Sequence, residues 1–487
     1  MESCIFSYYI SELDIEIEEL THRYIFGKYN VLTDSRTPFL YANNGKSECV
    51  IFGYAVNVFT ASSEDLAQEI INNSQNISNI IEFEKNLGGK YIILYRNEEK
   101  YYIFGDATCS IPVFYNTDGF FSCSNNSQYI VKQFGYCPDQ SLQAIRESGE
   151  ISQAMPYDIT QYCEIKQLTP NHYLMFERRK AVRFINSVQS QQAITVEKAS
   201  ELVAPMIETL CDFYKSKFKI YCPITSGRDS RVVLAFFADK NRVLQCYTIR
   251  HAEHHEDTQD IVIPKQLCAQ SNIPYEQIDD VVVSEELKSE MDHLLGENNY
   301  SLRTLRIAQT IKEHYGDGAV INGDIIGQVG KCSLHRDIPL CFATPEYFRC
   351  KLHNYSKESK RQLELWLEEI KNSGECVNTF DLFSIENRMG RWAAQENLIY
   401  NSIGQIYLNA FNSRSIIYLW TAVNRKERKM SSIHLSLIRK KMPKLLEVPF
   451  ESDDSMIIRL SKANGMTYLL SSYAKYYIER AKFKRGK

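Results

Sequence analysis

A short polar turn between two apolar runs carries the residues best suited to chemistry. The β-branched run that begins at Ile220 breaks into a turn at 225–230, and a helix-like segment follows at 231–238. Small residues let successive backbone N–H groups gather around an oxyanion, and the positive end of the following helix adds to the attraction. The turn is therefore typical of a phosphate site.

Asp229 is the unusual member of this turn. Its carboxylate would repel a bare phosphate unless a cation such as Mg²⁺ lay between them, which favours a metal-nucleotide as ligand. The alternative is an ordinary strand-to-helix turn in which Asp229 or Ser230 caps the helix. A Walker A loop is excluded, because the nearest match, at Lys331, has Ile325 in place of the first glycine and ends in Cys332.

Residues 225–230, with sequence TSGRDS, resemble the S-G-G-x-D-S pyrophosphate loop of the asparagine synthetase and β-lactam synthetase family. Further resemblances follow in the family's order along nearly the whole chain. They lie at 87–91, 102–107, 112–115 and 168–174 for its glutaminase-like domain, and at 387–389 and 411–414 for its D-R-M and P-F-L-D segments.

This resemblance implies an α/β protein of two domains. The first, at 1–185, would be an Ntn-type αββα glutaminase-like domain. The second, at 193–487, would be a doubly wound parallel-sheet ATP-pyrophosphatase domain with extra C-terminal helices. A chain of 487 residues with 44% hydrophobic residues is long enough for two or three cores.

The hydrophobic pattern agrees with that division. Alternating apolar runs predict a β-rich first third, a polar linker is expected at 186–192, and strands then alternate with helices as in parallel βαβ units. The expected strands are 50–58, 91–95, 101–104, 173–176, one from Ile220, 244–249 and 275–278, and the expected helices include 197–214, 363–372 and 381–394.

The family's enzymes join a carboxylate to the α-phosphate of ATP and then let an amine displace AMP, so the resemblance implies ATP and Mg²⁺ as cofactors. The nucleotide-binding residues it implies are Thr225, Ser226, Gly227, Arg228, Asp229, Ser230, Arg231 and Ile249. Arg228 and Arg231 could instead be surface charges at a helix end.

Asp229 and Asp324 are the implied magnesium ligands, and Asp324 is also a candidate catalytic residue. Asp324 follows Asn322 and Gly323 at a strand end, so a plain Asn-Gly-Asp turn is the alternative reading. The family's second acid, three residues later, falls on Gly327.

Lys462 is the implied phosphate-binding catalytic lysine, with Lys331 as its rival. Glu386 is the candidate catalytic base or base-orienting acid. Because Glu386, Arg388 and Arg391 cannot all share one helix face, some of them are expected to be structural ion-pair partners.

The N-terminus departs from the glutamine-hydrolysing members of the family. These enzymes expose a cysteine as the first residue after Met removal, where its α-amino group serves as base. Here Glu2 stands at that position and Cys4 lies further in. We therefore expect Cys4 to be a buried thiol and the chain not to make its own ammonia from glutamine.

Charge and composition limit the classes of partner that the protein is expected to bind. A net charge of −4 gives no general attraction to nucleic acid, the basic tail at 482–487 reads as a solvated helix end, and no apolar run reaches membrane-spanning length. The fourteen cysteines form no C-x-x-C pair, so we expect reduced thiols and a cytoplasmic protein. A metal site at the histidines of 251–257 is less favoured than a polar loop.

The expected activity is amide formation from a small-molecule, sugar-acid or peptide carboxylate and an amine, without nucleic acid or membrane as partner. Two alternatives stay open: an ammonia-dependent amidotransferase, and a degenerate non-catalytic binding protein. A homodimer is also left open.

Overall fold

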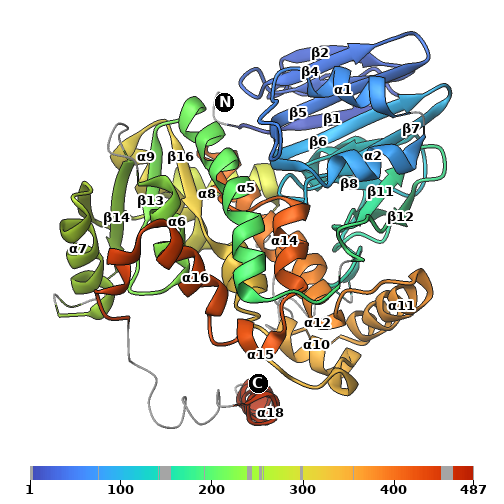
Figure 1. The fold of residues 1–487 in the computed structure, drawn as a ribbon. Helices are drawn as coiled ribbons and strands as arrows, with labels where there is room; N and C mark the ends of the chain where they lie inside the picture. Colours follow the sequence, from blue (N-terminus) through green and yellow to red (C-terminus); the bar gives the residue numbers. More distant parts are fainter. Residues whose placement is uncertain are drawn as a thin grey trace.

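The structure is a computed structural model, and it describes residues 4–74, 76–140, 142, 155–190, 192–238, 244–251, 255, 257–296, 300–354, 356–450 and 464–485. Two antiparallel sheets form the N-terminal part, and a parallel sheet surrounded by helices forms the rest (Figure 1).

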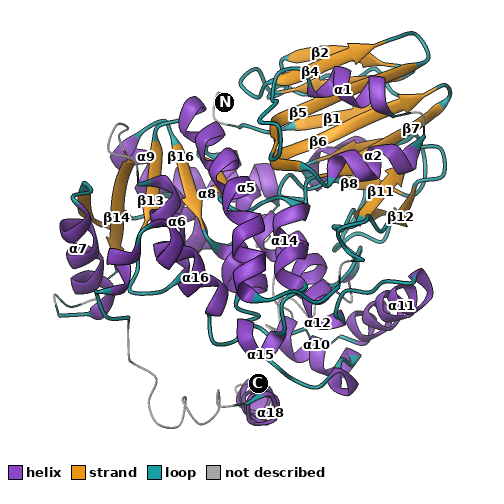
Figure 2. Ribbon diagram, viewed as in Figure 1, coloured by secondary structure: helices purple, strands orange, loops and turns teal. Residues whose placement is uncertain are grey.

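The N-terminal part is a sandwich of two six-stranded sheets, with strand orders β10-β8-β9-β1-β3-β2 and β12-β11-β7-β6-β5-β4 (Figure 2). The strands are β1 (Tyr8–Ser11), β2 (His22–Phe26), β3 (Tyr29–Thr33), β4 (Phe39–Asn43), β5 (Ser47–Asn57), β6 (Leu87–Asn97), β7 (Lys100–Gly105), β8 (Phe114–Asn116), β9 (Ser122–Ser124), β10 (Ile165–Gln167), β11 (His172–Met175) and β12 (Lys180–Arg183).

Alternation along these strands builds a core on each side of each sheet. Ile10 packs inward against Val50 and Ile92 of the other sheet, whereas Tyr9 points outward toward Ile130. Helices α1 (Leu66–Asn73) and α2 (Ile77–Glu84) cover the outer face of the β5-β6 sheet, and α3 (Ser127–Phe134) covers that of the β1-β3 sheet. The αββα arrangement expected from the sequence is confirmed.

The second part is built on a five-stranded sheet of order β15-β14-β13-β16-β17, in which every neighbouring pair is parallel. Its strands are β13 (Ile220–Pro223), β14 (Leu244–Arg250), β15 (Tyr275–Asp279), β16 (Ala319–Asn322) and β17 (Ile406–Asn409). The winding direction reverses between β13 and β16. The crevice outside the carboxyl ends of two such strands is the usual ligand site of an open α/β sheet.

Helices cover both faces of this sheet, so the doubly wound class is also confirmed. The helices are α5 (Val196–Lys217), α6 (Asp229–Phe237), α7 (Gln259–Ser271), α8 (Glu285–Leu295), α9 (Leu302–Tyr315), α10 (Pro345–Leu352), α11 (Lys357–Ser373), α12 (Thr379–Leu382), α13 (Ala394–Ser402), α14 (Arg414–Thr421), α15 (Arg425–Arg428), α16 (Ser432–Lys441) and α18 (Gly465–Arg485), with η1 (Ile326–Gly330), η2 (Leu340–Phe342), η3 (Phe383–Ala393) and η4 (Pro443–Leu446) between them. Cys222 and Ile321 pack with α5, α6 and α16 on one face of the sheet, while Tyr221 and Val320 pack with α9 and α13 on the other.

One local expectation needs correction. The expected helix at 381–394 is largely the π-helical η3, whose wider turn changes which side chains share a face. The described residues of the expected linker lie outside helices and strands, and Asn186 and Gln189 are buried there, with Gln189 donating to Glu375. None of the described helices is long and apolar enough to cross a membrane.

A buried polar seam, made of Glu84, Asn171, Arg183, Glu386 and Arg414, joins the two parts. Arg414 pairs with Glu84 and donates to Asn171 over 2.8 Å. Asn171 donates to Glu386 over 2.6 Å, and Arg183 grips the same carboxylate with bonds of 2.7 and 2.8 Å. Because these charges are out of water, each depends on its partner.

His335 is buried in the C-terminal helical region with no hydrogen-bond partner on either ring nitrogen. Its neighbours are aromatic, with ring centroids 4.9 Å away at Phe380 and 5.4 Å away at Phe383. Burial holds the pKa of His335 well below its usual value, and the charges of Lys351 and Arg425 act in the same direction. His335 therefore stays neutral in the folded protein.

We predict that this histidine makes folding acid-sensitive. An unfolded chain protonates His335 near pH 6.5 while the folded chain does not, so stability is complete above that pH. It should fall by up to about 1.4 kcal/mol for each pH unit below it. Urea unfolding at pH 7.5 and 5.5 measures the loss, which His335→Phe should reduce and the exposed control His22→Gln should not. Equal losses in all three proteins would contradict the assignment.

Candidate functional site

The turn at 225–230 lies where β13 ends, at the point where the winding direction of the parallel sheet reverses (the reversal point). Helix α6 begins within this segment, at Asp229, and its N-cap residue Arg228 makes no side-chain capping bond. Hydroxyls of Thr195, Ser284 and Ser301 cap α5, α8 and α9, whereas α1, α7, α14 and α16 lack a side-chain cap, as α6 does. An uncapped helix N-terminus at a strand's carboxyl end is well suited to an anion.

The turn is held by its own side chains and by one residue of α7. Asp260 accepts the backbone N–H of Ser226 over 2.8 Å and its hydroxyl over 2.6 Å. Thr225 Oγ1 accepts the N–H of Gly227 over 3.2 Å, and Ser230 Oγ lies 3.2 Å from Thr225 Oγ1. Asp260, at the start of α7, therefore helps to shape the turn.

Asp229 projects from the first turn of α6 and binds the buried His434 of α16, with 2.7 Å between Oδ1 and Nε2. Burial raises the pKa of Asp229, but His434, Lys331 and Arg228 outweigh it, so the pKa lies below its ordinary value. Asp229 is therefore ionised at neutral pH.

Gly327 faces the other oxygen of this carboxylate. A Cβ atom at Gly327 would lie 2.6 Å from Asp229 Oδ2, closer than atoms can pack. The position where the resemblance led us to look for a second acid therefore has no room for a side chain in this structure.

Asp324 follows β16 on the other side of the reversal point. Burial, together with the charge of Asp229, raises the pKa of Asp324 to about 6, although Tyr407 donates to Oδ2 over 3.3 Å. Asp324 thus belongs to an acidic site rather than to a plain exposed turn.

A metal would fit this pair of aspartates only together with a ligand that brings further oxygens. Among the described residues, no group of three or more His, Cys, Asp and Glu could hold a metal ion by itself. Mg²⁺ is commonly bound by one or two carboxylates plus phosphate oxygens and water. The donor set therefore fits a magnesium-nucleotide better than a resident metal.

A cavity of about 390 Å³ opens beside the turn, at the carboxyl ends of β13 and β14, and Val320 of β16 and Tyr407 of β17 also line it. Thr225 and Ile249, both expected to bind nucleotide, contribute to its wall. The other polar lining residues are Tyr247, Thr248, His251, Asp260, Arg303, Thr304, Glu396, Tyr400 and Tyr407. This volume is within the usual range for a small-molecule site.

Glu396, on α13, is a titratable residue of this cavity that sequence reasoning missed. Burial raises the pKa of Glu396 to about 8, the charge of Asp324 adds to the effect, and Thr304 donates to Oε1 over 3.3 Å. Arg388 opposes the shift and lies over the Trp392 ring at 4.2 Å. The only sequence signal was a glutamate within a helical segment of mixed polar and apolar residues.

Glu386 needs correction as the candidate base. Its side chain is fully buried in the polar seam, where Arg183, Asn171 and Trp366 all bind its two oxygens. It does not line the cavity at the strand ends, so the structure places it where it holds the two parts together.

Arg231 needs the same correction. Its guanidinium is buried and donates to the carbonyls of Leu445, Val448 and Pro449 and of Ser226 within the turn. These bonds occupy the groups that would have met a phosphate. Burial, with Arg228 adding to it, lowers the pKa of Arg231 to about 10.

The other predicted residues fall in three places. Arg228 and Lys331 stay beside Asp229, where their charges act on its carboxylate. Lys462 lies outside the described residues, as does part of the histidine loop; within that loop, His251 binds Asp280 over 2.7 Å. Cys4 is buried and its pKa is raised to about 11, mainly by that burial, which suits a structural thiol and not a nucleophile.

Comparison of the sequence with protein-family models gives no match, and comparison with curated proteins gives none. Among solved structures, an NMN synthetase from Francisella tularensis is similar over 43% of this chain and 93% of its own, at 13% identity and a TM-score of 0.19. A glutamine phosphoribosylpyrophosphate amidotransferase from B. subtilis is similar over 69% and 72%, at 11% identity and a TM-score of 0.22. The U34-tRNA thiolase NcsA from Methanococcus maripaludis is similar over 54% and 88%, at 12% identity and a TM-score of 0.21.

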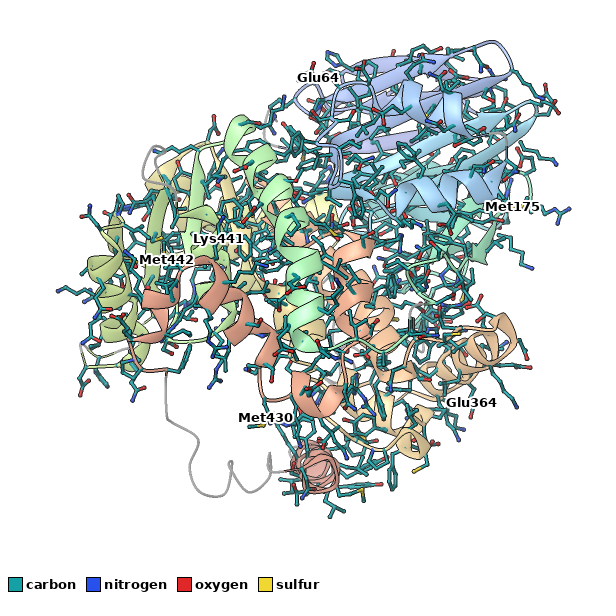
Figure 3. All side chains as sticks on the ribbon, in the orientation of Figure 1. Glu64, Met175, Glu364, Met430, Lys441 and Met442 are labelled. Carbon is teal, nitrogen blue, oxygen red and sulfur yellow. The ribbon has the colours of Figure 1, made fainter. Side chains whose placement is uncertain are left out.

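We predict that Glu386→Gln acts on folding. The substitution leaves Arg183 buried without its main counter-charge, so unfolding free energy should fall by about 3 kcal/mol. Urea unfolding measures this against Glu364→Gln, which alters an exposed residue of α11 (Figure 3) and should cost under about 0.5 kcal/mol. Equal stability of the two variants would exclude the structural role.

Proposed function

We propose that the protein is an ATP-dependent amide ligase that adenylates a carboxylate and transfers the acyl group to an amine, with release of AMP and pyrophosphate. The observation that supports this most is the meeting of three features at one reversal point. These are an uncapped helix N-terminus, a pair of aspartates suited to a magnesium-nucleotide, and a cavity with a carboxyl group of raised pKa.

In this proposal ATP lies across the ends of β13 and β14. Its phosphates meet the turn at 225–230 and the start of α6, and its base lies toward Ile249 in the cavity wall. When bound, Mg²⁺ would neutralise charge on the departing pyrophosphate. Arg228 and Lys331, both beside Asp229, are the described cations available for the same purpose.

The reaction balances in two steps. A carboxylate oxygen of the substrate attacks the α-phosphorus of ATP, and the bond to the β-phosphate oxygen breaks to release pyrophosphate. The amine nitrogen then attacks the acyl carbon, the bond to AMP breaks, and the ammonium proton must leave. Glu396 is our candidate for the group that takes this proton. It lines the cavity, and its raised pKa is closer than that of an ordinary carboxyl group to the pH at which a general base must work.

The buried thiol of Cys4 supports an enzyme that does not hydrolyse glutamine. We therefore propose an amine, or free ammonia, taken directly from solution. The carboxylate would be a small molecule, a sugar acid or a peptide, and the cavity volume does not select among them.

The first experiment is ATP–pyrophosphate exchange by the purified protein with Mg²⁺ and pools of carboxylates. Wild type should exchange label with one pool. Asp229→Asn should lose at least about 100-fold, since it removes a carboxylate that would hold Mg²⁺ beside the phosphates. The control Asp257→Asn, at an exposed residue outside the cavity, should match wild type. If no pool supports exchange, and amines added with each pool elicit no pyrophosphate release, the adenylation proposal fails.

A second prediction concerns pH. Glu396 can accept a proton only when ionised, so kcat/KM for amide formation should rise with pH through an apparent pKa of about 8 in the free enzyme. Glu396→Gln should slow the amide step by at least about 100-fold while leaving carboxylate-dependent exchange largely intact. A variant that keeps the wild-type rate and pH limb would remove Glu396 from the reaction.

A further inference from the structure

A second cavity, of about 340 Å³, lies at the opposite edge of the parallel sheet from the phosphate turn. We call it the junction cavity. Lys219 precedes β13, Gly318 precedes β16 and Ile406 begins β17, so one wall is formed at the amino ends of three neighbouring strands. Phe6 and Tyr54, from the two-sheet part, form the opposite wall. It shares no lining residue with the cavity that contains Glu396.

Aromatic rings form a continuous wall across the boundary between the two parts. The ring of Tyr54 meets Phe6 edge-on at 5.8 Å and Phe218 edge-on at 4.8 Å. Such a wall offers a flat ligand both apolar contact and ring edges.

The charged lining residues are mainly cations. Arg36, Lys217 and Lys219 contribute to the cavity, whereas its acid, Asp317, pairs with Lys312 over 2.7 Å. The local charge therefore favours an anion, although the whole chain is acidic.

Arg36 is held in position by a built turn. Asp34 is buried and accepts the backbone N–H groups of Arg36 and Thr37 over 2.8 and 2.9 Å. Arg36 in turn donates to the carbonyl of Cys4 over 2.7 Å. An arginine placed in this way keeps a fixed direction, as recognition of a carboxylate or phosphate requires.

Phe6 adds an indication of constraint. It adopts φ +56°, a left-handed conformation that is uncommon for an aromatic residue, and its N–H donates to Thr37 over 2.7 Å. Residues held in this conformation cluster at sites where the surrounding structure fixes a side chain for use. Here it turns the Phe6 ring into the cavity wall.

We propose that the junction cavity binds a small organic anion with a flat apolar body. Arg36, Lys217 and Lys219 would receive its carboxylate or phosphate group, and Phe6, Tyr54 and Phe218 would contact its flat part. The site is separate from the proposed nucleotide cavity and does not depend on the proposed reaction.

Benzoate, phenyl phosphate, benzamide and benzylamine are suitable probes, with affinities measured by saturation-transfer NMR on the full chain without nucleotide. Benzoate or phenyl phosphate should bind at least about fivefold more tightly than the neutral and cationic probes. The double variant Lys217→Glu/Lys219→Glu should weaken the anion by at least about tenfold and improve benzylamine binding.

Both substituted lysines are exposed, so the fold should tolerate the change, which the thermal midpoint checks. A matched control, Lys100→Glu/Lys371→Glu, makes the same charge change at exposed positions that do not line the cavity. Anion binding lost only in the first variant supports the proposal, and the tighter of the two anions identifies its charged group. Equal affinities for all four probes, or equal losses in both double variants, would overturn it.

Discussion

The ion pair between Glu84 and Arg414 is the constraint on which the arrangement of the two parts depends. Both side chains are almost fully out of water, so neither can be left unpaired without a large cost. Arg414 begins α14, which follows β17, and Glu84 ends α2 of the sandwich. This buried charge pair therefore joins α14, the helix that follows the last strand of the parallel sheet, to α2 in the outer helix layer of the two-sheet part. Asn171 extends this contact to the second pair, between Arg183 and Glu386.

Lys90 connects the two-sheet part directly to the residues around the proposed site. This buried lysine of β6 donates to Asn397 and Asn401 over 2.8 and 2.9 Å and to the carbonyl of Tyr407 over 3.2 Å. Burial lowers the pKa of Lys90 to about 7, although the charge of Asp106 acts in the opposite direction. Asn397 is the neighbour of Glu396, and the Tyr407 phenol binds Asp324. The two-sheet part thus holds the residues around the cavity at the strand ends in position. Its own Cys4 is buried.

Much of this could be predicted from the sequence. Period-two and helical patterns identified seven of the strands and several of the helices, and the TSGRDS turn identified a strand end suited to a ligand, because these signals are local. The errors came from long-range contacts. Arg231 looked available beside the turn, but carbonyls about 220 residues later in the chain occupy it. Glu386 was the candidate base, but Arg183 and Asn171 of the sandwich hold its carboxylate in the seam, and Glu396, which was missed, lines the cavity instead. No local pattern contains that information.

The pKa values of three acids at the reversal point increase from Asp229 to Asp324 to Glu396, and this series argues for a cationic ligand. The pKa of Asp229 is held below its ordinary value, that of Asp324 is raised to about 6, and that of Glu396 to about 8. Each raised value has burial as its main cause and the charge of the next acid as a further one. Like charges kept together in a buried site cost free energy unless something offsets them. A divalent cation at the two aspartates would lower the pKa of Asp324 and would offset its negative charge, which removes one cause of the raised pKa of Glu396. Binding of a magnesium-nucleotide would then prepare Glu396 to accept a proton only once the phosphates are in place.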